Sequence, residues 1–297
     1  MSKDSQIVQV SNPDPEVDRV TRIPLDLGQY RVAIAITAAC IFTGAGLLPE
    51  ILYLILLKVA GLEPWIVFTI LASAIGVFSV LTLLRRTWAL VRSDSTCRPT
   101  GSKRHHLDYF QWNFFTGFCY IAALMIAAIS TSRREDDSVA DTSTRLISLP
   151  VPMLVLQVSS QLLCACVMNR MHARYPFRVS SMDRTALVRP GVYTIVEDVL
   201  AVDGGQGEEY RRLLDARYCS SRGIRVLLAR LDLAWGLSGA IVATGLITLI
   251  ATLASRDTVF LIGWLVPWGW AGLLAVATRW MWNIALMHEK GEHYGKR

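Results

Sequence analysis

The stretch LAWGLSGAIVATGLITLIATLA, residues 233–254, has no charged side chain and is long enough to cross a bilayer as one helix. A hydrocarbon core about 30 Å thick needs roughly 20 mainly apolar helical residues. Similar blocks occupy residues 32–60, 66–84, 107–129, 146–168 and 259–278. Because a backbone in lipid must satisfy its own hydrogen bonds, the blocks predict an all-α polytopic membrane bundle of six transmembrane helices.

The composition supports a membrane protein. The chain is 53% hydrophobic and 18% charged, whereas a soluble domain carries about 25% charged residues. We expect spans one to four in residues 31–168 and spans five and six in residues 231–286. Residues 1–30 read as a disordered tail, 169–230 as a loop module and 287–297 as a second tail. Pro49-Glu50 interrupts the first block, so residues 31–60 either cross once or form a span with a re-entrant segment.

The distribution of Lys and Arg predicts the orientation. Residues 85–104 hold six basic side chains and residues 170–230 hold eleven, whereas the loops expected outside hold Arg133, Arg134, Arg145 and Arg256. The positive-inside rule therefore places both termini and the loop module in the cytoplasm. The net charge of +6 then follows from topology. The lipid bilayer is the expected partner, and no nucleic acid is expected.

The loop between spans four and five has the pattern of a small α/β-like module. VYTIVEDVLAV, residues 192–202, is rich in β-branched residues and predicts a strand or two short strands. Asp203-Gly204-Gly205 predicts a turn, and an amphipathic helix is expected from Glu208. Ser220-Ser221 is expected to cap a further helix that continues into span five. About 60 residues are too few for an independent core, so the module should pack on the bundle ends.

Three acidic residues in this module, Glu197, Asp198 and Asp203, are candidate site residues. One interpretation is an ion-pair layer with arginines such as Arg189, Arg211 or Arg212, docking the module on the bundle. The other is a site for a cation or a basic partner. A cytoplasmic protein partner through residues 170–230 is also expected.

The spans themselves carry polar and small residues at helical spacing. In span four a polar face predicts either interhelical hydrogen bonds or a path for a substrate; it comprises Gln157, Ser160, Gln161 and Cys164. In span five a stripe of small residues predicts close helix packing; it comprises Gly236, Ala240, Thr244, Thr248 and Thr252. In span six, Trp264, Trp268, Trp270, Trp280 and Trp282 fit two interfacial aromatic belts.

Glu50 and the histidines are further candidates. Glu50 either lies at the outer interface or forms a proton or cation site at the helix break that Pro49 creates. All five histidines fall near expected cytoplasmic helix ends, where they could bind a transition metal; they are His105, His106, His172, His288 and His293. Their spacing matches no metal-binding motif, so no cofactor is expected.

Three stretches together resemble a fungal family of multi-pass membrane proteins with no assigned activity. They are RPGVYTIVEDVLAVDGG, CRPTGSKRHHLDYFQWNF and GLLPEILYLILLK, and the match covers roughly residues 30–290. The resemblance implies the fold and the membrane location, and some such proteins are encoded near secondary-metabolite genes. It supplies no catalytic residue, and Glu50 departs from the apolar residue expected at its position.

Three function classes remain open. The favoured one is an accessory or scaffold membrane protein that presents its cytoplasmic module to a partner. The second is a small transporter, favoured by the polar face of span four. The third is a membrane-embedded enzyme acting on a lipid or secondary-metabolite intermediate, but no catalytic constellation is evident and the sequence favours a protein that is not an enzyme.

Overall fold

A computed structural model describes residues 46–103, 106–133, 137–253 and 255–294. Regular secondary structure in these residues is helical, and the loop 171–190 adds two isolated β-bridges. The helices are α3 (Leu48–Leu54), η2 (Ile55–Val59), α4 (Pro64–Val91), α5 (Tyr109–Ser132), α6 (Asp137–Ser148), α7 (Pro150–Arg170), α8 (Gly191–Val202), α9 (Gly207–Ser220), α10 (Arg222–Thr252) and α11 (Arg256–Tyr294).

Five stretches of helix are long and apolar enough to cross a membrane. They are Pro64–Val91, Tyr109–Ser132, Asp141–Arg170, Arg222–Thr252 and Asp257–Ala285. The prediction of an all-α membrane bundle is confirmed to this extent. The sixth predicted span, residues 32–60, lies mostly outside the described residues. Its described part is α3 followed by one π-helical turn, η2, so the count of six stays a prediction.

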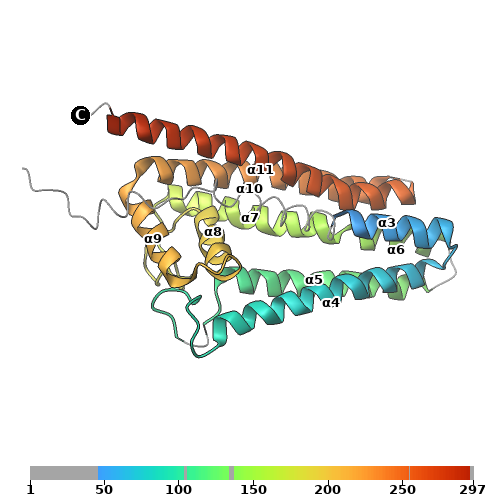
Figure 1. Ribbon diagram of the computed structural model, residues 1–297. Helices are drawn as coiled ribbons and strands as arrows, with labels where there is room; N and C mark the ends of the chain where they lie inside the picture. Colours follow the sequence, from blue (N-terminus) through green and yellow to red (C-terminus); the bar gives the residue numbers. More distant parts are fainter. Residues whose placement is uncertain (1–45, 104–105, 134–136, 254, 295–297) are drawn as a thin grey trace, which may run out of the picture.

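The long helices run side by side, with α7, α10 and α11 forming one layer and α4 and α5 another (Figure 1). Helix α10 packs most closely along α7, and α6 bridges α5 and α11. Helices α8 and α9 lie at one end of this bundle, together with the loop 92–108 (Figure 1). We call residues 92–103, 106–108 and 171–221 the cap. The opposite end of the bundle, near Lys58 and Asp257, is called the far end.

The strand prediction for residues 192–202 is wrong, because these residues form α8. The buried residues of α8 recur at helical spacing, which puts Glu197 and Asp198 on the inner face with Tyr193 and Ala201. Burial on one face of a helix outweighs the β propensity of Val and Ile. The carboxylate of Asp232 in α10 also accepts hydrogen bonds from the free backbone N–H groups of Gly191 and Val192, at 2.6 and 2.7 Å. The rest of the module is as expected: α9 is helical, and the Ser221 side chain caps α10.

The small-residue stripe of α10 is only partly an interface. Gly236 is buried against Leu163 of α7, and a Cβ atom there would lie 3.0 Å from the Leu163 side chain. Thr244, Thr248 and Thr252 are exposed, and each hydroxyl bonds to a carbonyl of its own helix. Four residues turn a helix by 400°, so a stripe with period four drifts around the axis. The face that is actually buried comprises Gly236, Gly239, Ala243, Leu246 and Ile250.

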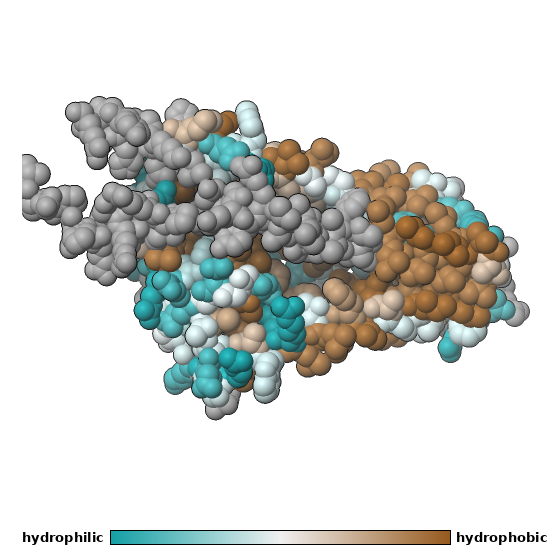
Figure 2. Space-filling view, in the orientation of Figure 1, coloured by the Kyte–Doolittle hydropathy of each residue, from teal (hydrophilic) through white to brown (hydrophobic). Residues whose placement is uncertain are grey.

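The tryptophans of α11 differ in their surroundings, and the two interfacial belts stay a prediction. Trp264 is buried and donates to the carbonyl of Ile147 at 3.0 Å, and Trp270 donates to Ser238 at 3.2 Å. Trp280, by contrast, is exposed. On the face that Figure 2 shows, the visible surface of the helices is mostly apolar (brown) and that of the cap mostly hydrophilic (teal). This division is the surface that a bilayer and an aqueous phase require.

Candidate functional site

Arg86, near the last turn of α4, is buried beneath the cap and binds three acidic residues. Its Nη2 donates to Asp108 Oδ2 at 2.6 Å and to the backbone carbonyl of Asp198 at 3.2 Å. Its Nη1 donates to the Asp203 carboxylate. The guanidinium also lies over the Phe110 ring, 4.5 Å from the centroid, a cation–π contact. Arg86 therefore ties α4 to the start of α5 and to the C-terminal half of α8.

Arg211 of α9 enters the same cluster from the other side. Its Nη1 donates to Asp198 Oδ1 at 2.7 Å and to Glu197 Oε1 at 3.1 Å. Its Nη2 donates to the carbonyl of Cys97 at 3.2 Å and lies 3.7 Å from Asp108 Oδ2. We call Arg86, Arg211, Asp108, Glu197, Asp198 and Asp203 the ion cluster. It connects α4, α5, α8, α9 and the loop 92–108.

The remaining oxygens of Asp108 and Asp198 bind neutral donors. Asp108 caps α5 by accepting from the Gln111 N–H at 2.8 Å. Asp198 Oδ2 accepts from Ser180 Oγ at 2.6 Å and from the Phe110 N–H at 3.2 Å. Hydrogen bonds of this kind offset the cost of removing charged groups from water. The cluster is thus built as a structural junction between bundle and cap.

Carboxylates outnumber guanidinium groups in the ion cluster, and the pKa values of two of the carboxyl groups are raised. Burial, followed by the charge of Asp198, raises the pKa of Asp108 to about 6, although Arg86 opposes the change. Burial also raises the pKa of Glu197, against the effect of Arg211. Buried carboxylates that exceed their cationic partners hold protons more readily.

The predicted acidic site is therefore only partly as expected. Glu197, Asp198 and Asp203 do meet, and arginines do pair with them, in accordance with the ion-pair interpretation. Of the three arginines suggested, only Arg211 takes part. Arg189 pairs with Asp215, and Arg212 pairs with Glu208 at 2.9 Å.

Two members of the cluster, Arg86 and Asp108, were missed by the sequence reasoning. Asp108 precedes the aromatic start of α5, where an N-cap aspartate is favoured, and this signal could have identified it. Arg86 reads in the sequence as one of the basic residues that follow a span.

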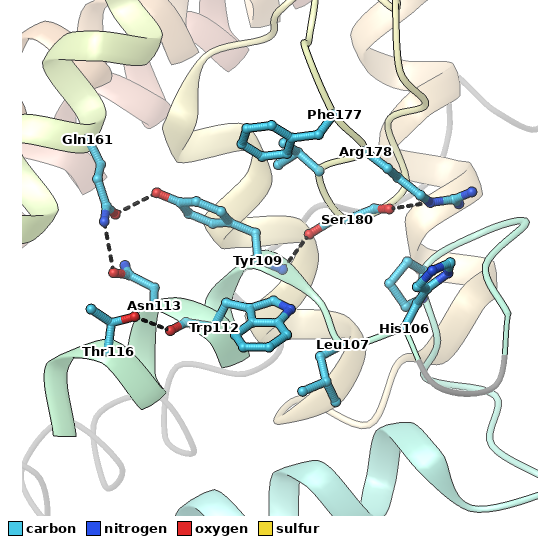
Figure 3. A pocket seen from close by; sticks show the side chains of 12 residues that line it. His106, Leu107, Tyr109, Trp112, Asn113, Thr116, Gln161, Phe177, Arg178 and Ser180 are labelled. Carbon is cyan, nitrogen blue, oxygen red and sulfur yellow. Dashed lines mark hydrogen bonds between the residues drawn. The ribbon is translucent and has the colours of Figure 1, made fainter. Parts of the chain in front are cut away.

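A pocket of about 490 Å³ adjoins the ion cluster through Ser180 (Figure 3). We call it the groove. Its lining combines the start of α5, part of α7 and the loop 177–180 of the cap. Aromatic residues border it, and Trp112 and Phe177 are 57% and 65% exposed. The groove thus lies where the apolar bundle meets the hydrophilic cap.

Hydrogen-bonded side chains form the wall of the groove between α5 and α7 (Figure 3). Tyr109 donates to Gln161 Oε1 at 2.5 Å, and Gln161 Nε2 donates to Asn113 Oδ1 at 2.9 Å. Deeper in the bundle, Gln157 Nε2 donates to the carbonyl of Asn113 at 3.2 Å. The interhelical hydrogen bonds expected of span four are confirmed for Gln157 and Gln161. Gln161 also lines the groove.

A hydroxyl and an amide oxygen remain unsatisfied near the groove. Tyr120 Oη and Gln157 Oε1 are buried and have no hydrogen-bond partner among the described residues. A Cβ atom at Gly117 would lie 3.9 Å from the first and 3.5 Å from the second. The polar wall therefore continues from Tyr109 into the apolar part of the bundle and ends in groups able to accept or donate further hydrogen bonds.

The other candidate residues lie outside the ion cluster. Glu50 is in α3, toward the far end. His106 borders the groove and His172 follows α7; both are exposed. His105 lies outside the described residues, as do the side chains of His288 and His293 in α11. In the described part of the chain, no group of three or more His, Cys, Asp or Glu residues is placed to hold a metal ion.

Comparison with known proteins identifies a family. A family model described as Domain of unknown function (DUF8766) matches residues 9–293. No curated protein and no solved structure matches the chain. A family without an assigned activity was expected, whereas the fungal source and the link to secondary metabolism stay predictions.

Proposed function

The chain belongs to the DUF8766 family, whose model covers the bundle and the cap alike, and we propose that it binds an amphipathic, lipid-soluble molecule in the groove. The ligand enters from the adjacent lipid leaflet, which the distribution of basic residues assigns to the cytoplasmic side. The observation that carries the proposal is the groove itself, with a volume of about 490 Å³ at the boundary between apolar bundle and polar cap. Binding pockets for small molecules typically measure about 300–1,000 Å³.

The lining indicates the chemistry of the ligand. Trp112 and Phe177 offer apolar surface to a hydrocarbon chain or ring system, while Tyr109, Asn113 and Gln161 offer neutral hydrogen-bonding groups. A ligand with an uncharged hydroxyl or carbonyl group fits this combination, since neutral donors and acceptors pair with neutral groups without leaving a buried charge.

The arginine in the lining does not favour an anionic ligand. Arg178 donates to the carbonyls of Ser180, Gly101 and Thr100, and its Nη1 lies 2.9 Å from Asp183. Four of its five N–H groups are therefore directed to partners within the cap. Binding and movement of a neutral amphipathic molecule agree with this lining better than chemistry on a charged substrate.

Photolabelling with an uncharged probe tests the proposal. The probe is a long-chain alcohol carrying a diazirine, added to the full-length protein in lipid nanodiscs, with adducts located by mass spectrometry. We expect adducts concentrated in the first two turns of α5 and in the part of α7 around Gln161. Excess unlabelled alcohol should compete, and the corresponding fatty acid should compete less.

The matched variants are Thr116→Phe and Thr248→Phe. Both threonines are exposed and bond only to their own helix in the contacts described, but Thr116 lines the groove and Thr248 lies on the outer face of α10. Thr116→Phe should reduce labelling of the groove several-fold, and Thr248→Phe should not. Labelling spread evenly over the lipid-facing helices, unaffected by Thr116→Phe, would refute ligand binding in the groove.

A second function, presentation of the cap to a cytoplasmic protein, is favoured by the rigid attachment of α9. Arg211 anchors this helix to the ion cluster, and Arg212, the next residue, is directed outward with 69% of its side chain exposed. Proximity labelling in cells from a tag inserted at residues 204–206 tests this role. Arg212→Glu should deplete the labelled proteins and Thr116→Phe should not; an unchanged set would speak against presentation.

A further inference from the structure

Glu50 lies on the buried face of α3 at membrane depth. Gly46, Pro49, Glu50 and Tyr53 are all buried, and their spacing places them on one side of the helix. Glu50 precedes Lys58 by eight residues, which corresponds to about 12 Å along a helix. Lys58 pairs with Asp257 at the far end, at 2.8 Å. With the Lys58–Asp257 pair taken as the edge of the hydrocarbon core, which is about 30 Å thick, the Glu50 carboxyl lies inside it.

Among the described residues, no polar partner compensates this carboxyl. Glu50 is 4% exposed, and neither carboxyl oxygen has a hydrogen-bond partner among the described residues. Nearby, a Cβ atom at Gly46 would lie 3.1 Å from the Trp268 ring. The Nε1 of Trp268 also has no hydrogen-bond partner among the described residues. An isolated carboxylate in such surroundings is strongly disfavoured, whereas a neutral carboxylic acid is tolerated.

Charged groups on the surrounding helices are engaged elsewhere. The basic residues of α4 are Arg85 and Arg86, at the end next to the cap, and Arg86 belongs to the ion cluster. In α11, Asp257 binds Lys58 and accepts from Tyr53 Oη at 3.3 Å. Arg279 lies more than twenty residues further along α11, toward the cap. Among the contacts described, none of these groups bonds to Glu50.

We propose that Glu50 is a reversible proton-binding site within the membrane, reached from the far end of the bundle past Tyr53. A metal ion is a poorer occupant, because Mg²⁺ and Ca²⁺ require about six or more oxygen ligands and Glu50 is an isolated carboxyl. A proton needs only the one carboxylate. This inference is independent of ligand binding in the groove.

A pocket at the far end supplies the route. It measures about 430 Å³ and is lined by Tyr53, Lys58, Asp257 and neighbouring residues. Tyr53 reaches from the buried face of α3 to this pocket, where its hydroxyl bonds to Asp257. Since Tyr53 follows Glu50 by about one helical turn on the same buried face and also lines the pocket, we take Tyr53 as the link between the pocket and the carboxyl. A phenol can accept and donate a proton in succession, so it can pass one along.

The experiment uses dicyclohexylcarbodiimide, which modifies protonated carboxyl groups in apolar surroundings, on the full-length protein in nanodiscs. At neutral pH, mass spectrometry should find the adduct on Glu50. Labelling of Glu63, an exposed glutamate in the same molecule, should be several-fold lower. Alkaline pH should reduce Glu50 labelling several-fold as the proton leaves. Glu50→Gln, which keeps the shape of the side chain, should remove the adduct and leave the thermal unfolding midpoint unchanged.

Infrared spectroscopy tests the route separately. The carbonyl stretch of the protonated acid, identified as the band missing in Glu50→Gln, should shift when the sample is transferred to D₂O. Tyr53→Phe should slow this exchange several-fold without changing the band itself. Absence of the adduct from folded wild-type protein, or an adduct that does not depend on pH, would overturn the site. Equal exchange rates in Tyr53→Phe and the wild type would overturn the route.

Discussion

Replacement of Arg211 by methionine is the sharpest test of the ion cluster. Arg211 is 1% exposed, and it is bonded to Glu197 and Asp198, which are both 0% exposed. Removing the guanidinium leaves the buried carboxyl groups of Glu197 and Asp198 without their hydrogen bonds to Arg211. Loss of one partner from a buried ion pair costs about 3–5 kcal/mol, because the charge left behind is neither hydrated nor paired.

A loss of this size is large against a total stability of about 5–15 kcal/mol. We expect the thermal unfolding midpoint of the detergent-solubilised protein to fall by about 10 °C, as judged by tryptophan fluorescence. Limited proteolysis should cut the cap first, since α9 loses its attachment to the bundle. The control is Arg212→Met in the next position, whose pair with Glu208 is exposed. Exposed pairs contribute about 0–1 kcal/mol, so this variant should unfold close to the wild type.

Neutralising the carboxylates as well distinguishes a charge effect from a packing effect. Arg211→Met combined with Glu197→Gln and Asp198→Asn should recover a substantial part of the lost stability, since a neutral network carries no uncompensated charge. Glu197→Gln with Asp198→Asn alone should be destabilising, because buried Arg211 then loses both hydrogen-bonded carboxylates and keeps only Asp108, 3.7 Å away, as a counter-ion. Equal unfolding midpoints for Arg211→Met and Arg212→Met would refute the reasoning.

Three further outcomes follow from the contacts. The pKa of Asp108, raised to about 6 from 3.8, means that the folded protein binds more protons than the unfolded chain between these values. The free energy of unfolding should therefore fall as the pH rises through this window, by about 3 kcal/mol at most. Asp108→Asn should flatten the profile of the unfolding midpoint against pH. An unfolding midpoint that rises through the window would contradict this. Gly236→Leu should lower the folded yield through overpacking against Leu163, at a cost of about 1–3 kcal/mol, whereas Thr248→Leu on the exposed face should be tolerated; equal yields in size-exclusion chromatography would mean that Gly236 faces lipid. Asp232→Ala should destabilise α8 by about 0.5–2 kcal/mol, because the backbone N–H groups at the start of α8 lose their side-chain acceptor. Amide hydrogen exchange in α8 should become faster. Unchanged exchange would show that these N–H groups have another acceptor.

The helices of the bundle could be predicted from the sequence more accurately than the contacts between them. Residues 66–84 and 107–129 were expected as spans and lie within or nearly within α4 and α5. The helix that begins near Glu208 and the N-cap of α10 at Ser221 were also expected. The strand in place of α8 was an error, because Val and Ile carry high β propensity but the burial of adjacent Glu197 and Asp198 cannot be read locally.

The residues of the candidate site could likewise be predicted from the sequence better than their contacts. The acidic run Glu197, Asp198 and Asp203 stood out as unusual in a loop rich in arginine, and the structure shows two arginines, Arg86 and Arg211, bonded to it. Which arginine does so could not be chosen, since Arg189, Arg211 and Arg212 have the same chemistry. The groove was indicated only by the polar face of span four, because its aromatic border comes from α5 and from the cap.

The sequence by itself determined that this protein crosses a membrane, since mean hydropathy over about 20 residues is a local property that no contact can reverse. It also indicated that the acidic and basic residues of the loop form ion pairs, while a site for a cation or a basic partner remained the alternative. Only the tertiary structure decided that Arg86 meets Asp203, 117 residues away, and Asp108, 22 residues away. Such pairs depend on the relative positions of α4, α5 and α8. Those positions are decided by the packing of side chains on helix surfaces, a property of the whole bundle rather than of any one segment.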